Sequence, residues 1–597
     1  MITPQLPAVD RDRTLELERF LPQLVWLLPL LVYAATLRFQ FIYDDNQQIL
    51  NDPLIRSWHN LPLLLKVDVW RFWNPGVIGN YWRPLFMLWL VINYKIFGLN
   101  PIGWHLTSVL VHVAATWLCF VLVRRITGEK FIATTAALIF GLHPVHLETV
   151  AWVSGVTDSL MSVFFLSSLL CFIHGWESQG KRRYGYFVIS SLLFACSLLT
   201  KETAVVLPGI VVGYVLLFPR EHGDGVRHRF ASLLLPLLLY AAVIAAYFTE
   251  RHAVLQGFDH GAIRVGVQTY LLTCPSFLWF YLSHLIWPSG LSIFYDRPVV
   301  SHADWSHFWM PLLGIMIGTV TTAIGISKER GRGAYFGALL LLLPLAPTFA
   351  LPLILPNDYA HDRYLYLPCL GFGILAALLL QQLGERLAAR MNGRYVMLGL
   401  ASGIVVALAT STSVQMVHWA NDLLLYDRAA EIAPGNLMSF EGLGRSLLAV
   451  GRPTEAISAF QQVLKVNPND WAALHDLGLH DFQNRNYPES ERYLKRAAAL
   501  RTSDSDNAAL LAEVLNREGK FAEAEPFIRH ALDLRPRKPG YRRVLAESLD
   551  GQGKKTDAML EIEGELKDHP EDVESQELLK QLQSKRDTIG DCCGQEP

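Results

Sequence analysis

Cysteine is scarce in this sequence, and its placement excludes a small domain held together by disulfides. Only seven of the 597 residues are cysteine. Five of them lie in or beside apolar segments, and the other two, Cys592 and Cys593, are adjacent near the C-terminus. Adjacent cysteines rarely bridge each other, and the remaining spacings form no disulfide framework.

Charge is also sparse, with only 18% of residues charged and a net charge of −2. This average hides two unlike parts. Residues 1–420 carry one apolar run after another, whereas residues 421–597 are polar, charged and rich in Ala, Leu and Glu. No basic tract is present, so we expect no nucleic-acid partner. A soluble fold cannot bury so many long apolar runs, and the first part is therefore predicted to be a polytopic helical membrane domain.

The apolar runs of the first part are long enough to be membrane-spanning helices. Two of them, 84–98 and 269–288, are interrupted by polar residues or proline, which suits helices that lie in the interface. Without these two, the pattern predicts about eleven spans at 1.5 Å of rise per residue. They lie near residues 21–39, 103–123, 131–150, 157–175, 184–200, 203–218, 231–249, 307–327, 334–351, 364–383 and 395–417.

Basic residues between the spans set the predicted orientation, because cytoplasmic loops carry an excess of Lys and Arg. If the two interfacial runs do not cross, connections such as Lys181-Arg182-Arg183 and Arg386–Arg394 all face the cytoplasm. Residues 1–20 are then a cytoplasmic N-terminus, and residues 421–597 lie outside. Residues 1–20 contain no cleavage-like site, so we expect the first span, 21–39, to be retained as an anchor.

Two adjacent carboxylates, Asp44 and Asp45, directly follow the first span. Like charges this close repel and raise one another's pKa, so the pair needs a cation, a proton or a basic ligand group nearby. Their hard oxygens suit Mg²⁺ or Mn²⁺, which makes them candidate metal ligands. Alternatively, one of them is the general base for an acceptor hydroxyl. A solvated loop is the plain alternative, but the outer-face position before an aromatic and basic loop favours a functional pair.

A second polar group is predicted in the outer turn 143–156. His143 and His146 are three residues apart and close to Glu148, a spacing compatible with one helix face. Zinc binding is disfavoured, because Pro144 disrupts a helix and neither a cysteine nor a further histidine joins the pair. We predict instead that these side chains form the polar wall of a sugar pocket or support Asp44.

Basic residues of the outer loops are candidates for binding a phosphate. Arg363 directly precedes a span, and its guanidinium fork suits a lipid-linked phosphate; a snorkelling interfacial arginine is the plain alternative. Arg83 and Lys201 are similar candidates. Lys201 and Glu202 lie between two apolar runs, which favours a functional pair and a structural ion pair equally. The complete set of candidate site residues is Asp44, Asp45, Arg83, His143, His146, Glu148, Lys201, Glu202, His361, Asp362 and Arg363.

The polar part contains an internal repeat with a period of 34 residues. Pro434, Pro468, Pro536 and Pro570 lie on one grid, whose missing member is Thr502. This period, with small residues at the helix crossings and proline at the end of each unit, is the tetratricopeptide pattern. It predicts four repeats over 437–570, then a terminal helix and tail over 571–597. The small-residue registers are Gly444, Gly478, Ala512 and Ala546, and Ala456, Ser490, Ala524 and Ala558; Gly451, Gly519 and Gly553 mark the turns, with Arg485 as the exception.

In their order along the chain, these motifs resemble one family. The chain is similar to the transmembrane and tetratricopeptide-repeat-containing O-mannosyltransferases and their bacterial relatives, in the GT-C class of glycosyltransferases. Two features differ: the repeat array is short, and the middle loop reads Gln256–Gly261 where an Asp-Asn-Pro-Ala stretch is typical. The motifs are Asp44-Asp45, Tyr81-Trp82-Arg83-Pro84, Leu142-His143-Pro144-Val145-His146, Lys201-Glu202 and Arg363-Tyr364-Leu365-Tyr366-Leu367-Pro368, followed by the repeats.

The resemblance implies a GT-C-like membrane domain over 21–420 that transfers a sugar, with mannose expected, from a polyprenyl-phosphate donor to a protein hydroxyl. It implies an inverting reaction on the outer face of a multi-pass cell membrane, the inner membrane of a bacterium. Asp44 and Asp45 match the catalytic pair, and Arg363, with Arg83 and Lys201, suits the donor phosphate. The repeats, outside the membrane, would hold the acceptor protein. His143, His146, Glu148, Glu202, His361 and Asp362 are assigned to the sugar and acceptor pocket.

Two other classes of function fit parts of the sequence. One is a transporter or flippase of lipid-linked sugars, but the chain shows no two halves of similar pattern, and its polar residues gather on one face rather than at the midplane. The other is a non-catalytic membrane scaffold whose repeats recruit partners. A scaffold has no need of the Asp44-Asp45 pair, and that pair therefore discriminates between scaffold and enzyme.

Overall fold

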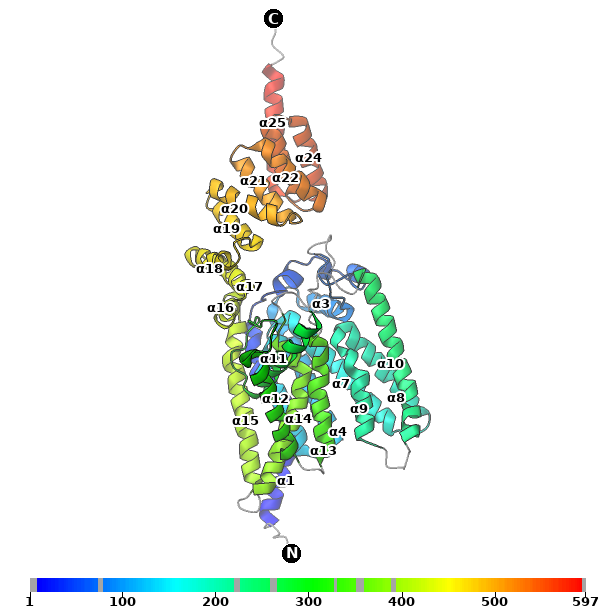
Figure 1. Ribbon diagram of the computed structural model, residues 1–597. Coiled ribbons are helices and arrows are strands. Elements are labelled where there is room, and N and C mark those ends of the chain that lie inside the picture. The colour runs from blue at the N-terminus through cyan, green and yellow to red at the C-terminus, as the bar shows by residue number, and fades with distance from the viewer. Residues whose placement is uncertain are drawn as a thin grey trace. The chain divides into compact units, whose positions relative to one another are not determined.

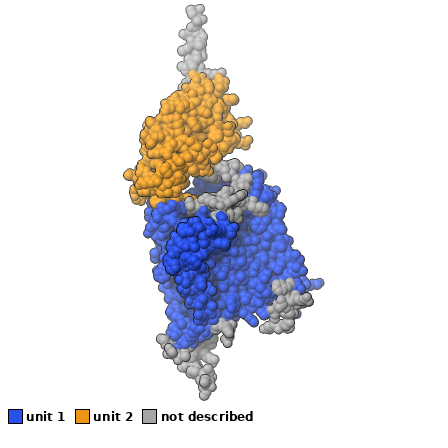
Figure 2. Space-filling model, in the orientation of Figure 1, with its two compact units in different colours: residues 1–436 blue, residues 437–597 orange. Residues whose placement is uncertain are grey.

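The computed structural model describes residues 8–72, 79–219, 226–257, 266–326, 330–349, 359–387 and 393–592. Within these ranges the chain forms helices and no strands (Figure 1). It divides into two compact units, residues 1–436 and 437–597, which Figure 2 shows in different colours. The predicted fold class, an all-α membrane domain followed by helical repeats, is confirmed. Of the regions named from the sequence, residues 1–7, 258–261, 327, 350–351, 388–392 and 593–597 lie outside the described residues.

The first unit consists mainly of long apolar helices. Nine helices of the described residues are long and apolar enough to cross a membrane, or ten if the bent pair Lys130–Leu142 and Pro144–Val150 is one span. The helices are α1 (Ala8–Tyr33), α2 (Leu61–Leu64), α3 (Pro84–Phe97), α4 (Pro101–Thr127), α5 (Lys130–Leu142), α6 (Leu147–Val150), α7 (Thr157–Glu177), α8 (Lys181–Thr200), α9 (Leu207–Leu217), α10 (Val226–Leu255), α11 (Val267–Ile286), α12 (Met310–Gly325), α13 (Gly331–Leu342), α14 (Tyr366–Leu387), α15 (Gly393–Met416) and α16 (Asp422–Ile432).

The sequence predicts about eleven spans, and the difference comes from two runs: 131–150, which forms the bent pair, and 203–218. The second of these runs forms a 3₁₀ turn and the short helix α9, which together cover Glu202–Leu217. At 1.5 Å of rise per residue, that length is short of a full crossing. The two runs assigned to the interface form α3 and α11, and neither is among the helices that meet the length and composition of a span. Their place in the interface stays a prediction.

Small residues let the helices of the first unit pack closely. A Cβ on Gly371 of α14 would lie 2.3 Å from the backbone nitrogen of Leu341 on α13. In a membrane the hydrophobic effect does not drive helices together, so they associate through close van der Waals packing at small residues of this kind. Buried hydroxyls join other helices: Ser190 of α8 bonds to Ser168 of α7 and to the Tyr240 hydroxyl of α10. These contacts hold neighbouring helices of the first unit together.

At the ends of the long helices the chain forms short irregular elements. A π-turn, Asn46–Leu50, follows α1, and 3₁₀ turns precede α7 (Val153–Val156), α9 (Glu202–Val206) and α14 (Asp362–Leu365). Backbone groups at helix ends lack intrahelical partners, so polar side chains are expected to gather there. This is where the predicted site residues lie.

The second unit is a stack of helical hairpins with the predicted 34-residue period. Gly444 and Gly478 stand where the helices of a hairpin cross, because a Cβ there would meet Phe460 at 2.5 Å and Leu494 at 2.6 Å. The turn residue has positive φ in all four hairpins, including the non-glycine Arg485 at 61°. The helices are α17 (Leu437–Ala449), α18 (Pro453–Val466), α19 (Trp471–Gln483), α20 (Tyr487–Leu500), α21 (Ser505–Arg517), α22 (Phe521–Leu534), α23 (Tyr541–Gly551), α24 (Lys555–Asp568) and α25 (Val573–Cys592).

Candidate active site

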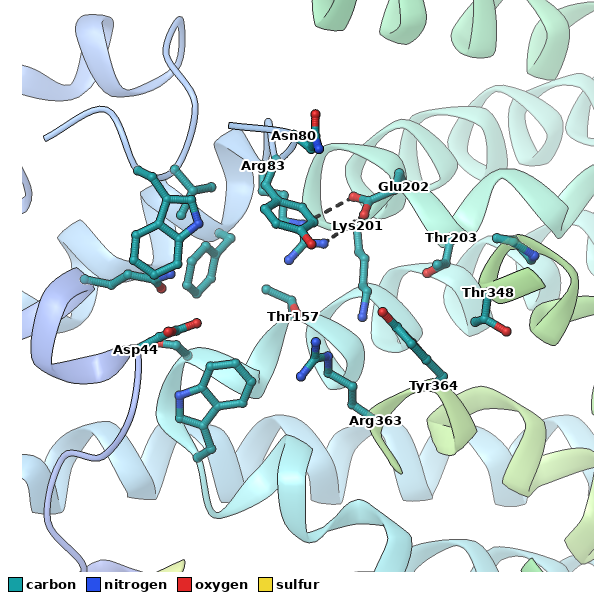
Figure 3. A pocket seen from close by; sticks show the side chains of 18 of the residues that line it. Asp44, Asn80, Arg83, Thr157, Lys201, Glu202, Thr203, Thr348, Arg363 and Tyr364 are labelled. Atoms are coloured by element: carbon teal, nitrogen blue, oxygen red, sulfur yellow. Dashed lines mark hydrogen bonds and ion pairs between the residues drawn. The ribbon is translucent and has the colours of Figure 1, made fainter. Parts of the chain in front are cut away.

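A cavity of about 350 Å³ opens where the irregular elements of the first unit meet. Its lining comes from segments far apart in the sequence, each next to the end of a long helix. Figure 3 shows Asp44 at one side of the space, with Arg83, Lys201 and Arg363 reaching in from the others. The lining residues are Tyr43, Asp44, Gln48, Val69, Trp70, Asn80, Tyr81, Arg83, Phe86, Trp152, Ser154, Thr157, Lys201, Glu202, Thr203, Arg251, Pro347, Thr348, Arg363 and Tyr364.

The two carboxylates predicted as a pair have different surroundings. Asp44 lines the cavity. Asp45 is fully buried: its Oδ1 accepts hydrogen bonds from the Ser154 backbone N–H at 2.8 Å and from the Ser154 hydroxyl at 2.6 Å, and its Oδ2 accepts one from the Ile42 N–H at 3.3 Å. Burial raises the pKa of Asp45 to about 7, because its effect is larger than that of the hydrogen bonds, which lower this pKa. Burial, rather than repulsion from Asp44 as the sequence suggested, is therefore the main cause of this shift.

Lys201 and Glu202 do not pair with each other. The Lys201 ammonium donates to both oxygens of Asp158, at 2.7 and 2.6 Å, and both side chains are almost fully buried. Glu202 instead accepts two hydrogen bonds from the Arg83 guanidinium, at 3.3 and 2.8 Å. Burial would raise the pKa of Glu202, but the facing Arg83 outweighs it and holds that pKa at about 2. The pair predicted from the sequence is therefore two separate ion pairs.

Arg363 is held against the cavity by a fully buried carboxylate. Its backbone N–H donates to Oε2 of Glu148 at 2.9 Å, and its guanidinium donates to Oε1 of the same side chain. The ring nitrogen Nδ1 of His361 lies 3.4 Å from that carboxylate. The guanidinium carbon is 5.6 Å from the centre of the Trp152 ring. Arg363 is thus placed by polar contacts on one side and an aromatic ring on the other.

Five residues predicted to line the pocket lie behind its wall. His143 contacts the Leu285 carbonyl oxygen at 2.9 Å, and the His146 ring packs on Tyr366, with 4.5 Å between ring centres. Asp362 accepts a hydrogen bond from the Tyr295 hydroxyl. The chain bends by 51° at His143, between α5 and Pro144–Val150, and the imidazoles of His143 and His146 are both fully buried. The five residues are His143, His146, Glu148, His361 and Asp362, none of them on the lining.

Sequence reasoning missed several residues of the site. Trp152 and Ser154 lie within the predicted outer turn 143–156, but nothing in their local pattern separates them from other outer-loop residues. Asp158 lies just after this turn, and its buried bond to Lys201 has no sequence signal. Asp422, which contacts the loop around Asp44, is more than 370 residues away in the chain. In the sequence, the pair Asn421-Asp422 indicates only the start of a helix.

The surroundings of Asp45 do not fit a metal ion held jointly by Asp44 and Asp45. Both oxygens of Asp45 already accept hydrogen bonds from N–H or O–H donors. Among the described residues, no group of three His, Cys, Asp or Glu side chains is arranged to hold a metal. We therefore derive no chemical step through a metal, and a requirement for Mg²⁺ or Mn²⁺ stays a prediction.

Comparison with known proteins supports the resemblance seen in the motifs. Residues 83–248 match the family described as dolichyl-phosphate-mannose-protein mannosyltransferase, and residues 442–508 and 475–539 match a tetratricopeptide repeat family. Protein O-mannosyl-transferase F38B6.6 of Caenorhabditis elegans is 24% identical over 74% of this chain and 62% of its own length. Protein O-mannosyl-transferase TMTC2 of Homo sapiens is 35% identical over 32% of this chain and 24% of its own length.

This chain spans less than two thirds of the length of these relatives. Among solved structures, ArnT from Cupriavidus metallidurans bound to undecaprenyl phosphate is 16% identical, covering 90% of this chain and 88% of that chain at a TM-score of 0.37. MamA is 19% identical and covers 26% of this chain at a TM-score of 0.23. Both structures superpose too loosely for residues to be matched one by one.

Proposed function

We propose that this chain, a relative of the protein O-mannosyl-transferases, is a membrane glycosyltransferase that moves a sugar from a polyprenyl-phosphate donor to a protein hydroxyl with inversion. Mannose is the proposed sugar, from the names of the relatives. The observation that carries the proposal is the cavity itself, where the Asp44 carboxylate faces basic side chains from separate segments of the chain. Two of the basic residues, Arg83 and Lys201, lie within the matched mannosyltransferase region, residues 83–248.

The basic side of the cavity suits the donor phosphate. Arg83, Lys201 and Arg363 are each fixed by a carboxylate, so they need little rearrangement when a phosphate arrives. Preorganised donors of this kind stabilise the charge that develops on a leaving group. Aromatic side chains, among them Trp70 and Trp152, line the same cavity and offer flat apolar faces to a sugar ring.

Asp44 is the proposed general base. It accepts the proton of the acceptor hydroxyl as the hydroxyl oxygen bonds to the anomeric carbon, on the side opposite the phosphate. The bond from that carbon to the phosphate oxygen breaks, and the phosphate leaves as an anion next to the basic residues. Attack from the opposite side inverts the configuration at the anomeric carbon. Asp45, buried against Ser154, supports the loop rather than the reaction.

A purified-protein assay tests the proposal. Incubated with defined polyprenyl-phosphate sugars, the protein is expected to release free polyprenyl phosphate, and to transfer sugar when an acceptor protein is added. The Asp44→Asn variant is the matched control, and a chelator arm tests the metal requirement separately. If the wild type releases polyprenyl phosphate no faster than Asp44→Asn with every donor, the proposed activity is contradicted and the scaffold alternative is favoured.

We place the cavity on the extracytoplasmic face. Helix α8 begins at Lys181 and ends at Thr200, next to Lys201 in the cavity wall. Its 20 residues span ~30 Å, about the thickness of a bilayer core, so the basic cluster Lys181-Arg182-Arg183 stands at the opposite membrane face. Because basic clusters face the cytoplasm, the cavity faces outward.

Labelling of intact cells tests this orientation. We expect a cysteine introduced at Asn80, in the cavity wall, to react with a membrane-impermeant reagent, because it faces outward. A cysteine at Arg182 should react only after the cells are opened. The opposite pattern would place the cavity on the cytoplasmic side. The repeats, proposed to be extracytoplasmic and to hold the acceptor protein, can be tagged and tested in the same way.

A further inference from the structure

We propose that Asp422 is a positioning residue that holds the catalytic loop, residues 40–46, in its working conformation. This proposal rests on the proposed function, because it assigns a role in placing the general base Asp44. The Asp422 carboxylate accepts two short hydrogen bonds, from the Tyr43 backbone N–H at 2.7 Å and from the Asn46 side-chain amide at 2.7 Å. The two donors stand on either side of Asp44 and Asp45 in the chain, so one carboxylate fixes both ends of the acidic pair.

The loop needs such support because its backbone is strained. Tyr43 has a φ of 53°, in the left-handed region that a bulky side chain rarely adopts. Its ring is surrounded by aromatic side chains, with ring centres 5.4 Å from Trp152, 6.0 Å from Phe294 and 6.4 Å from Tyr426. The hydrogen bond from the Tyr43 N–H to Asp422 secures the backbone of this strained residue directly before Asp44.

Helix α16, which carries Asp422, is itself anchored to the first unit. Asn421 caps the start of the helix by accepting a hydrogen bond from the Leu424 N–H at 3.0 Å. The neighbouring Ala420 carbonyl accepts one from the Gln40 N–H, also at 3.0 Å. Just beyond the other end of the helix, the Gly435 N–H donates to the Asp296 carboxylate at 2.7 Å. Asp422 is therefore presented to the loop from a fixed helix.

This arrangement gives α16 a role beyond linking the two units along the chain. It begins shortly after the last long apolar helix, and the first repeat helix follows it at Leu437. The residue that holds the catalytic loop thus lies on the helix that leads into the repeats. Loss of the Asp422 contacts is expected to slow the chemical step while leaving donor binding unchanged, since the hydrogen bonds of Asp422 go to Tyr43 and Asn46 on the acidic side of the cavity.

Replacement of Asp422 tests the proposal. In Asp422→Ala we expect kcat to fall ~10²-fold, the loss that a displacement of about 1 Å of a catalytic group produces, with KM for the donor unchanged. Asp422→Asn retains an acceptor for the Tyr43 N–H but faces the Asn46 amide with a second amide. The reciprocal variant Asp422→Asn with Asn46→Asp restores that hydrogen bond in reverse and should recover most of kcat. Asp427→Ala, an exposed aspartate of the same helix, is the control and should match the wild type.

Amide hydrogen exchange of residues 40–51 measures the loop without reference to catalysis. Exchange should be faster in Asp422→Ala than in the wild type, and restored in the reciprocal variant. Unchanged exchange and kcat in Asp422→Ala, or a reciprocal variant no better than Asp422→Asn alone, would overturn the positioning role. If the wild type transfers no sugar while the exchange pattern holds, the proposed function fails and the structural support of the loop stands.

Discussion

Asp44→Asn is expected to lower sugar transfer by ~10²–10⁴-fold, the contribution typical of a general base. An amide has nearly the shape of a carboxylate but cannot accept the proton of the acceptor hydroxyl. Because Asp44 lines the cavity while Asp45 faces Ser154, the loss belongs to Asp44 rather than to the pair. Single-turnover transfer, measured with donor bound in advance, separates this chemical effect from donor binding, which should stay within twofold to threefold of the wild type.

Asp45→Asn is the matched comparison, and its effect should lie in stability and its pH dependence. The pKa of Asp45, about 7 in the folded protein, is raised by burial above its ordinary value of 3.8. The folded state then holds a proton that the unfolded chain has lost, so this contribution to stability is full below pH 4 and is lost as the pH rises through 7. Asp45→Asn removes this contribution, and thermal unfolding between pH 5 and 8 should show a flatter dependence. Equal losses of transfer in both variants would contradict the separate roles.

The sequence was sufficient to name the acidic residue and the basic residues of the proposed reaction that line the cavity, although six of its eleven candidate residues are not on the lining. A membrane domain has only two faces, so orienting the spans by their basic connections brought Asp44, Arg83, Lys201 and Arg363 to the same side. Their convergence on one lining follows the same logic, since polar side chains gather where helices end. The helical repeats were equally readable, because the two glycines of the small-residue register, Gly444 and Gly478, stand at close helix contacts.

The pairing of charges could not be read from the sequence. Adjacent residues suggested Lys201 with Glu202, but Lys201 ends α8 in an extended conformation and Glu202 begins a 3₁₀ turn, so their side chains diverge to Asp158 and Arg83. The prediction that His143 and His146 line the pocket failed for a similar reason, because the chain bends just before Pro144 and the bend is packed among buried aromatic rings. Ion-pair partners that are so distant in the chain depend on tertiary packing, which local sequence patterns do not show.

Arg363→Ala is expected to have two effects, which a second substitution separates. Removal of the guanidinium takes away charge-assisted hydrogen bonds to the donor phosphate, each worth about 1.5–3 kcal/mol, and so should weaken donor binding ~10- to 100-fold. It also leaves the Glu148 carboxylate, which is fully buried, without its main partner. Breaking a buried ion pair in this way typically costs about 3–5 kcal/mol of stability.

The double variant Arg363→Ala with Glu148→Gln removes the orphaned charge along with the cation. Its unfolding temperature should return toward the wild-type value, whereas donor affinity should stay as low as in Arg363→Ala. Arg363→Lys should recover only part of the affinity, because a point charge cannot reproduce the two-pronged contact of a guanidinium with a phosphate. Donor affinity and unfolding temperature are measured on the same purified samples. A stable double variant that binds donor as tightly as the wild type would show that the phosphate is bound elsewhere than at Arg363.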